Sequence, residues 1–158
     1  LFGLELSKEK TRILPFGRNC GTRETFDFLG FTHFNSKTRK GYYSVGHKIS
    51  RKKKKQFKSN LKKWVKENRD KQFDEFMKKL NKKLTGSFNY YSLSGMIREV
   101  RNLWNHAQYV TFKWLNRRSQ RRSFKLERFY EIWNDLIVHP YIHVDIWSGD
   151  KVIYNKNV

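Results

Sequence analysis

Apolar residues recur with the spacing of an α-helix from about residue 50 onward, and this periodicity limits the possible folds more than any other feature. The first such segment has one apolar face, with members at i, i+4, i+7 and i+8. They are Phe57, Leu61, Trp64 and Val65. Ser50 precedes the segment and suits the N-cap position. Most other positions are lysine, so the segment predicts an amphipathic helix with a cationic outer surface.

Three further segments repeat the helical pattern. A second helix is predicted over residues 73–84, closed by Gly86, and a third over residues 94–115. A fourth is expected to begin near Ser123 and to end before Pro140. The apolar positions expected to be buried are Phe73, Phe76, Met77, Leu80, Leu84, Ile97, Val100, Leu103, Trp104, Ala107, Val110, Trp114, Phe129, Trp133 and Leu136. The connector between the second and third helices is expected to hold Phe88, Tyr90 and Tyr91.

The N-terminal part has the pattern of strands and turns instead. Residues 12–14 and 26–29 are short apolar runs bounded by proline and glycine, which predicts strands. Residues 32–34 and 42–45 predict a hairpin around the basic turn 37–41. The predicted fold class is therefore α+β and mostly α, with a short β-hairpin region followed by three to four helices.

Charge indicates the class of partner. The formal charge is +21, from 35 Lys and Arg against 14 Asp and Glu, and a chain of this kind attracts nucleic acid. Aromatic residues make up 16% of the chain, more than a disordered basic tail would contain, and they can fill a core or stack on unpaired bases. An anionic membrane surface is the alternative partner. It would require one continuous apolar face opposite the lysines, and the aromatic residues are not arranged in that way.

Three negative features favour an intracellular protein. Cys20 is the single cysteine, so neither a disulfide framework nor a Cys-x-x-Cys metal site is expected. The sequence has no run of 18 apolar residues and no signal-peptide pattern, so no membrane partner is expected. The expected compartment is the bacterial cytoplasm or an organellar matrix.

Four motifs carry a resemblance to a known family. Residues 4–11 read Leu-Glu-Leu-Ser-Lys-Glu-Lys-Thr and residues 26–31 read Phe-Asp-Phe-Leu-Gly-Phe. Residues 86–91 have the form Gly-x-x-Asn-Tyr-Tyr, and residues 114–123 hold an arginine-rich block. In this order they resemble the group II intron reverse transcriptase/maturase family, over nearly the whole chain as far as about Asp135. The first two motifs are similar to the last motifs of the polymerase palm, and the others to the thumb, or maturase X domain.

The resemblance implies a domain organisation. Residues 1–48 would be the end of the palm with the primer-grip motif, residues 49–138 the helical thumb/maturase domain, and residues 139–158 a C-terminal tail. A chain that opens on Leu1, late in a palm, is expected to have its beginning elsewhere. The missing N-terminal fingers and palm portion is thus one implied partner.

The palm motifs imply two kinds of site residue. Lys10 matches a lysine that lies near the departing pyrophosphate in such polymerases, with an accessory catalytic role in the intact enzyme only. Phe28, Leu29 and Gly30 match the primer grip, where Phe28 is expected to be core and the Gly30 backbone to approach the primer. The sequence has no Asp-Asp pair for the Mg²⁺ ions of polymerisation, so no cofactor is expected in this chain and it should be inactive alone.

Two basic clusters are the predicted nucleic-acid contacts. The lysines of the first helix are Lys52, Lys53, Lys54, Lys55 and Lys62. They can contact phosphates without reading sequence, although a solvated helix face is the plainer interpretation. The arginine block consists of Arg117, Arg118, Arg121 and Arg122. On a helix these four would project from one side and could fork a phosphate or stack on a base, or they could simply offset a helix dipole.

The sequence thus favours the C-terminal part of an RNA-directed DNA polymerase/intron maturase. Its implied partners are group II intron RNA and an RNA template with a DNA primer, which it would bind to support splicing and reverse transcription. The alternatives are a stand-alone, non-catalytic maturase-type splicing factor and an unrelated basic scaffold protein of ribosomal type. His139, His143 and Asp145 would make a metal site only in a nuclease tail, which no cysteine or Glu-His helix pair supports.

Overall fold

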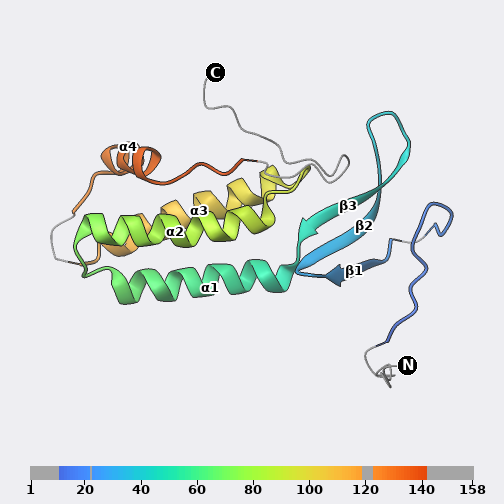
Figure 1. Ribbon diagram of the computed structural model, residues 1–158, viewed down its shortest axis with the longest axis horizontal. Helices are drawn as coiled ribbons and strands as arrows, with labels where there is room; N and C mark the ends of the chain where they lie inside the picture. The colour runs from blue at the N-terminus through green and yellow to red at the C-terminus, as the bar shows by residue number, and fades with distance from the viewer. Residues whose placement is uncertain (1–10, 22, 119–122, 142–158) are drawn as a thin grey trace, which may run out of the picture. The chain divides into compact units, whose positions relative to one another are not determined.

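The computed structural model describes residues 11–21, 23–118 and 123–141 (Figure 1). The chain divides between His47 and Lys48 into two compact units. Within these residues the elements in chain order are three strands and then four helices, which confirms the predicted α+β, mostly α class.

The N-terminal unit is built on an antiparallel sheet in the order β1-β2-β3. The strands are β1 (Thr25–Phe28), β2 (Phe31–Lys37) and β3 (Tyr43–Ile49), the last of which continues past the boundary between the units. Strands β2 and β3 form the predicted hairpin, and within its basic turn the Thr38 amide donates to the Tyr42 carbonyl at 2.8 Å. The ring of Phe34 lies over Gly46 so closely that a Cβ there would collide with it.

Two predictions for this unit are wrong. Residues 12–14 form no strand, and the side chain of Ile13 is 96% exposed, so this apolar run has no face to bury. Phe28 is 60% exposed rather than core. It shares a strand face with Phe26, but Phe26 is the one packed by rings: Phe16 and His33 lie at centroid distances of 4.9 and 4.8 Å. Phe28 is the last residue before the turn, at the tip of the hairpin.

The C-terminal unit is a bundle in which α1, α2 and α3 lie side by side and α4 packs against α2 and α3 (Figure 1). The helices are α1 (Arg51–Asn68), α2 (Phe73–Tyr91), α3 (Ile97–Leu115) and α4 (Leu126–Leu136). Aromatic pairs Phe57–Phe88 and Trp64–Phe76 join α1 to α2 in antiparallel fashion. The largest fully buried side chains of the bundle include Trp133, Phe76, Phe129, Leu61, Met77, Leu80, Leu84 and Leu103.

Helix α2 is longer than predicted. Gly86 was expected to end the helix, but α2 continues to Tyr91, and the expected aromatic connector forms its last turn. Phe88 and Tyr91 are buried on the same stripe as Leu84. Burying one large apolar side chain contributes about 1.5–3 kcal/mol, which exceeds the roughly 1 kcal/mol that a glycine costs inside a helix.

Helix α4 is shorter than predicted, and its C-terminal end buries a different residue from the one predicted. It begins at Leu126 rather than near Ser123, and it ends before Pro140 as expected. Leu136, predicted to be buried, is 42% exposed, while Ile137 just beyond the helix is 2% exposed. Leu136 is the last residue of α4, and the chain becomes extended at Ile137, whose side chain is the one buried here.

In the part of the chain that the structure describes, none of the helices is both long and apolar enough to cross a membrane.

Candidate nucleic-acid interface

Helix α1 carries a continuous row of cations. Arg51, Lys55, Lys58, Lys62 and Lys66 follow at intervals of three or four residues, so they share one face of the helix, and all five are exposed. We call this row the cationic stripe. The one acidic residue of α1, Glu67, lies on another face and pairs with Lys63 at 3.9 Å. No carboxylate of α1 therefore offsets the stripe.

The N-terminal turn of α1 makes this charge unfavourable for the helix itself. Ser50 caps the helix as predicted, with its hydroxyl accepting from the Lys53 amide at 3.3 Å. The first turn holds no acidic residue and consists of cations. A helix N-terminus carries a partial positive charge, so each of these cations opposes the macrodipole. Helix stability alone does not explain such a sequence.

The stripe borders the seam between α1 and α3. Lys54 lies next to the stripe, but its ammonium is 2.8 Å from the Glu99 carboxylate on α3 and so is engaged within the fold. One turn further, the charge of Lys58 acts on His106 of α3: burial first, and Lys58 second, lower the pKa of His106. The lowered pKa favours a neutral His106, so the positive charge of this surface is that of lysine and arginine side chains.

The stripe ends in a cluster of cations around one indole ring. Lys66 lies 5.8 Å, and Arg69 and Arg117 each 5.5 Å, from the centroid of the Trp114 ring. A nitrogen of Arg118 donates to the Arg69 carbonyl at 3.3 Å, which brings in a fourth cation. We call these four residues and the ring the Trp114 cluster.

A single carboxylate contacts the Trp114 cluster among the described residues. It belongs to Asp70, which is exposed and 3.7 Å from Arg69. The C-termini of α1 and α3 meet here, and their dipoles favour some positive charge. Each cation–ring contact contributes about 0.5–1 kcal/mol at such a site. Four cations against one carboxylate still leave a strong net charge, which suits a phosphate.

The predicted arginine block is only partly seen, and its helical arrangement is not confirmed. Helix α3 ends at Leu115, so Arg117 and Arg118 lie in the turn that follows rather than on a helix. Arg118 donates a hydrogen bond to the carbonyl of Arg69 at the end of α1. This resembles the alternative role of offsetting a helix dipole, but the helix is the neighbouring α1 rather than the one that precedes Arg118. Residues Arg121 and Arg122 lie outside the described residues.

The other predicted lysines divide into two groups. Lys55 and Lys62 belong to the cationic stripe, Lys52 is exposed and borders it, and Lys53 is exposed on the opposite face of α1. Sequence reasoning missed the engagement of Lys54 by Glu99, and it placed Trp114 in the core although the structure has it half-buried among cations. No sequence signal pairs α1 with α3, because their contacts span about 45 residues.

The primer-grip motif forms the tip of the first hairpin. Phe28 pairs with Phe31 across the strands, and Leu29 and Gly30 make the two-residue turn between them. Their φ angles are 48° and 84°, the pattern of a type I′ turn. Leu29 is a poor residue for this conformation, which favours Gly, Asn or Asp, and its side chain is 68% exposed. Lys10 lies outside the described residues.

Of the three residues weighed against a metal site, the structure describes one. His143 and Asp145 lie outside the described residues. His139 is described, and its ring stacks on Trp104 at a centroid distance of 4.7 Å. Within residues 11–21, 23–118 and 123–141 no three His, Cys, Asp or Glu side chains are grouped to hold a metal ion.

Comparison with known families identifies the helical unit. The family model for the group II intron, maturase-specific domain matches residues 54–132, half of the chain, and spans α1 to α4. The chain therefore belongs to this family, which confirms the resemblance drawn from its thumb motifs. Membership indicates a group II intron maturase-related function in splicing and the binding of intron RNA. No curated protein and no solved structure matches the chain significantly.

Proposed function

We propose that the cationic stripe and the Trp114 cluster are the surface that holds group II intron RNA. The observation that carries this proposal is the distribution of charge on α1. The cationic stripe is of one sign from end to end, even at the N-terminal turn, where the helix dipole disfavours cations. A polyanion with regularly spaced phosphates offsets this charge, and its binding releases counterions.

The proposed role is binding rather than chemistry. An intron RNA performs its own transesterification, so the protein acts by binding the spliceable fold in preference to competing folds, which raises the population of that fold. Lysine is suited to this task, because it contacts phosphates without reading base sequence. Arg117 can add a forked contact to a phosphate beside Trp114.

A splicing assay tests this proposal with the full 158-residue chain. A panel of group II intron RNAs is incubated at Mg²⁺ concentrations too low for splicing by RNA alone, with and without protein. The protein should restore splicing of at least one of these introns, and the double variant Lys66→Glu, Arg117→Glu should not. The matched control Lys78→Glu, Lys82→Glu changes two exposed lysines of α2 and should behave like the unaltered protein. Equal loss in both double variants would contradict the assignment of the surface.

A second function, support of reverse transcription, is favoured by the exposed hairpin tip. Phe28 and Leu29 are large apolar side chains held in solvent by a turn that Leu29 fits poorly, which suits contact with a primer strand. In the intact polymerase, Mg²⁺ would be held by upstream carboxylates, which this chain lacks, and Lys10 would lie near the pyrophosphate. Primer extension after mixing the chain with an upstream fragment that contains Tyr-x-Asp-Asp tests this function. Absence of extension, with intron RNA still bound, would favour the stand-alone splicing factor.

A further inference from the structure

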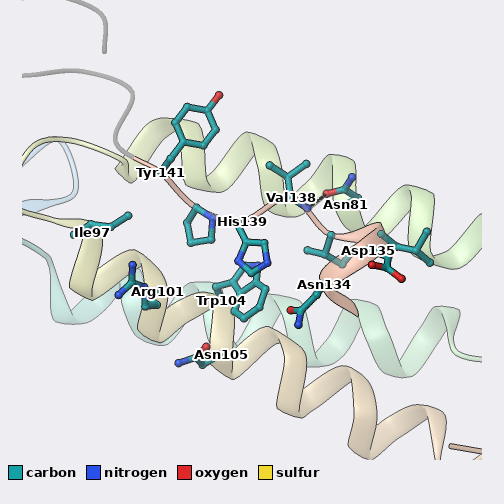
Figure 2. A pocket seen from close by; sticks show the side chains of 13 residues that line it. Asn81, Ile97, Arg101, Trp104, Asn105, Asn134, Asp135, Val138, His139 and Tyr141 are labelled. Carbon is teal, nitrogen blue, oxygen red and sulfur yellow. Dashed lines mark hydrogen bonds between the residues drawn. The ribbon is translucent and has the colours of Figure 1, made fainter. Parts of the chain in front are cut away.

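A pocket of about 1080 Å³ lies on another side of the helical unit, between α2, α3 and the segment that follows α4 (Figure 2). Its lining includes Arg101, Trp104 and Asn105 from α3, Asn134 from α4, and His139 beyond α4. The pocket is distinct from the cationic stripe. On α3, Glu99 and His106 face α1, and Arg101 is two residues, or about 200°, further round the helix from Glu99.

The centre of the pocket is a stack of two aromatic rings. His139 lies over Trp104 at 4.7 Å with 29° between the ring planes, and Figure 2 shows the two rings facing each other. Trp104 is itself held edge-on by Trp133, which is fully buried, at 5.7 Å. The stack is therefore anchored in the core. His139 is exposed, so a ligand can reach part of its ring.

The backbone around His139 is fixed from two sides. The Val138 amide donates to the side-chain oxygen of Asn81 on α2 at 3.1 Å, and the Ile137 amide donates to the Trp133 carbonyl at 2.9 Å. A ring on a segment tied in this way loses little conformational freedom when a ligand stacks on it, so the stack is preorganised for binding.

The polar lining matches a nucleotide better than a free anion. The exposed amides of Asn105 and Asn134 each offer a donor and an acceptor, as the edge of a base requires. The exposed guanidinium of Arg101 can contact a phosphate. Asp135 also lines the pocket, and its carboxylate repels a bare phosphate but can accept from a base amino group.

We propose that this pocket binds one unstacked nucleotide of the intron RNA, with the base stacked on His139 as the third ring. The proposal rests on the RNA-binding function proposed above and adds a second, shape-dependent contact. The cationic stripe supplies sequence-independent affinity for phosphates, and the pocket adds a preference for RNA in which a nucleotide is flipped out of its helix. Such a preference distinguishes a folded intron from an uninterrupted duplex.

The test compares two RNA hairpins that differ by a single bulged 2-aminopurine, whose fluorescence is quenched on stacking. The full chain should quench the bulged base and bind that hairpin about 5- to 150-fold more tightly, the range for one base stacked on an aromatic side chain. His139→Ala should lose the quenching and the preference, while keeping its affinity for the unbulged hairpin. Tyr130→Ala, which removes an exposed aromatic of α4 outside the pocket, is the matched control.

Two further variants separate ring stacking from charge. His139→Phe keeps a ring and should retain the preference, whereas His139→Lys places a cation there without a ring and should lose the preference. Thermal melting of each variant shows that the fold is kept. Equal affinity of the unaltered protein for both hairpins, or equal loss in His139→Phe and His139→Ala, would overturn the pocket alone. Failure to bind either hairpin would overturn the interface and the pocket together.

Discussion

Neutralising three lysines of the cationic stripe should change the salt dependence of RNA binding by a calculable amount. The variant is Lys55→Gln, Lys58→Gln, Lys62→Gln, at three exposed positions on successive turns of one face. None of the three has an ion-pair partner within the described residues, so their removal breaks no ion pair of the fold. The effect on binding should therefore come from lost phosphate contacts.

The magnitude follows from counterion release. Each phosphate contact contributes about 0.7–0.9 to the slope of log affinity against log salt, so three contacts contribute about 2.1–2.7. Over a fourfold rise in salt, from about 50 to 200 mM, a slope difference of this size narrows the gap in affinity between unaltered protein and variant about 20- to 40-fold. The gap should thus be largest at low salt and should shrink steadily.

Fluorescence anisotropy with a labelled group II intron domain, at five or more salt concentrations, measures both slopes. The matched control is Lys78→Gln, Lys82→Gln, Lys83→Gln, which removes the same charge from exposed positions of α2. Its slope should stay close to that of the unaltered protein. If the two triple variants show the same reduction in slope, binding depends on net charge alone, and the assignment of α1 as the interface is wrong.

The remaining predictions concern stability. Lys53→Glu completes a capping box with the N-cap serine and interacts favourably with the helix dipole, so thermal denaturation should show a free energy of unfolding about 1 kcal/mol higher. The same variant should lose less RNA affinity than a charge reversal within the stripe. Leu29→Asn replaces a strained turn residue by a favoured one and should raise the free energy of unfolding of the hairpin unit by about 0.5–1 kcal/mol in denaturant titrations, while weakening any primer contact. Burial first, and then the charge of His33, whose Nδ1 is 2.8 Å away, lower the pKa of His47 below 6.5. The unfolded chain therefore binds a proton at His47 more readily than the folded chain does, so the free energy of unfolding should be highest above pH 6.5 and fall as the pH drops below it. NMR titration of His47 and thermal melts at pH 7.5 and 5 check this. The variant His47→Gln should show a weaker dependence of stability on pH.

The helical unit was largely predictable because its signal is local. Amphipathic spacing located all four helices, and the N-cap at Ser50 is a one-residue signal that the structure confirms. Failures came where tertiary packing overrides a local rule. Gly86 stays inside α2 because Phe88 and Tyr91 gain more from burial than the glycine costs. Phe28 follows the alternation of a strand, but it lies at the hairpin tip, where alternation no longer implies burial.

The candidate sites were predictable in charge but not in geometry. Counting lysines on α1 identifies a cationic helix, yet the sequence does not say which lysine is neutralised by α3, or that the stripe ends at Trp114. The Trp104–His139 stack joins residues 35 positions apart and requires α4 to return along α3. A histidine that follows a helix belongs to no sequence pattern that would predict stacking on a distant tryptophan.

The charge of α1 also connects the stability of the fold with its function. Four neighbouring pairs within the stripe repel each other by about 0.2–0.5 kcal/mol each, or about 1–2 kcal/mol together, and the first turn adds its opposition to the dipole. Domains of this size have stabilities of only about 5–15 kcal/mol, so this repulsion is a substantial fraction. Salt screens the repulsion and should stabilise the folded chain, but it also screens phosphate contacts and should weaken RNA binding. Because of these residues, salt should stabilise the fold and weaken RNA binding at the same time. Bound RNA relieves the same repulsion among the cations that salt screens in the free protein.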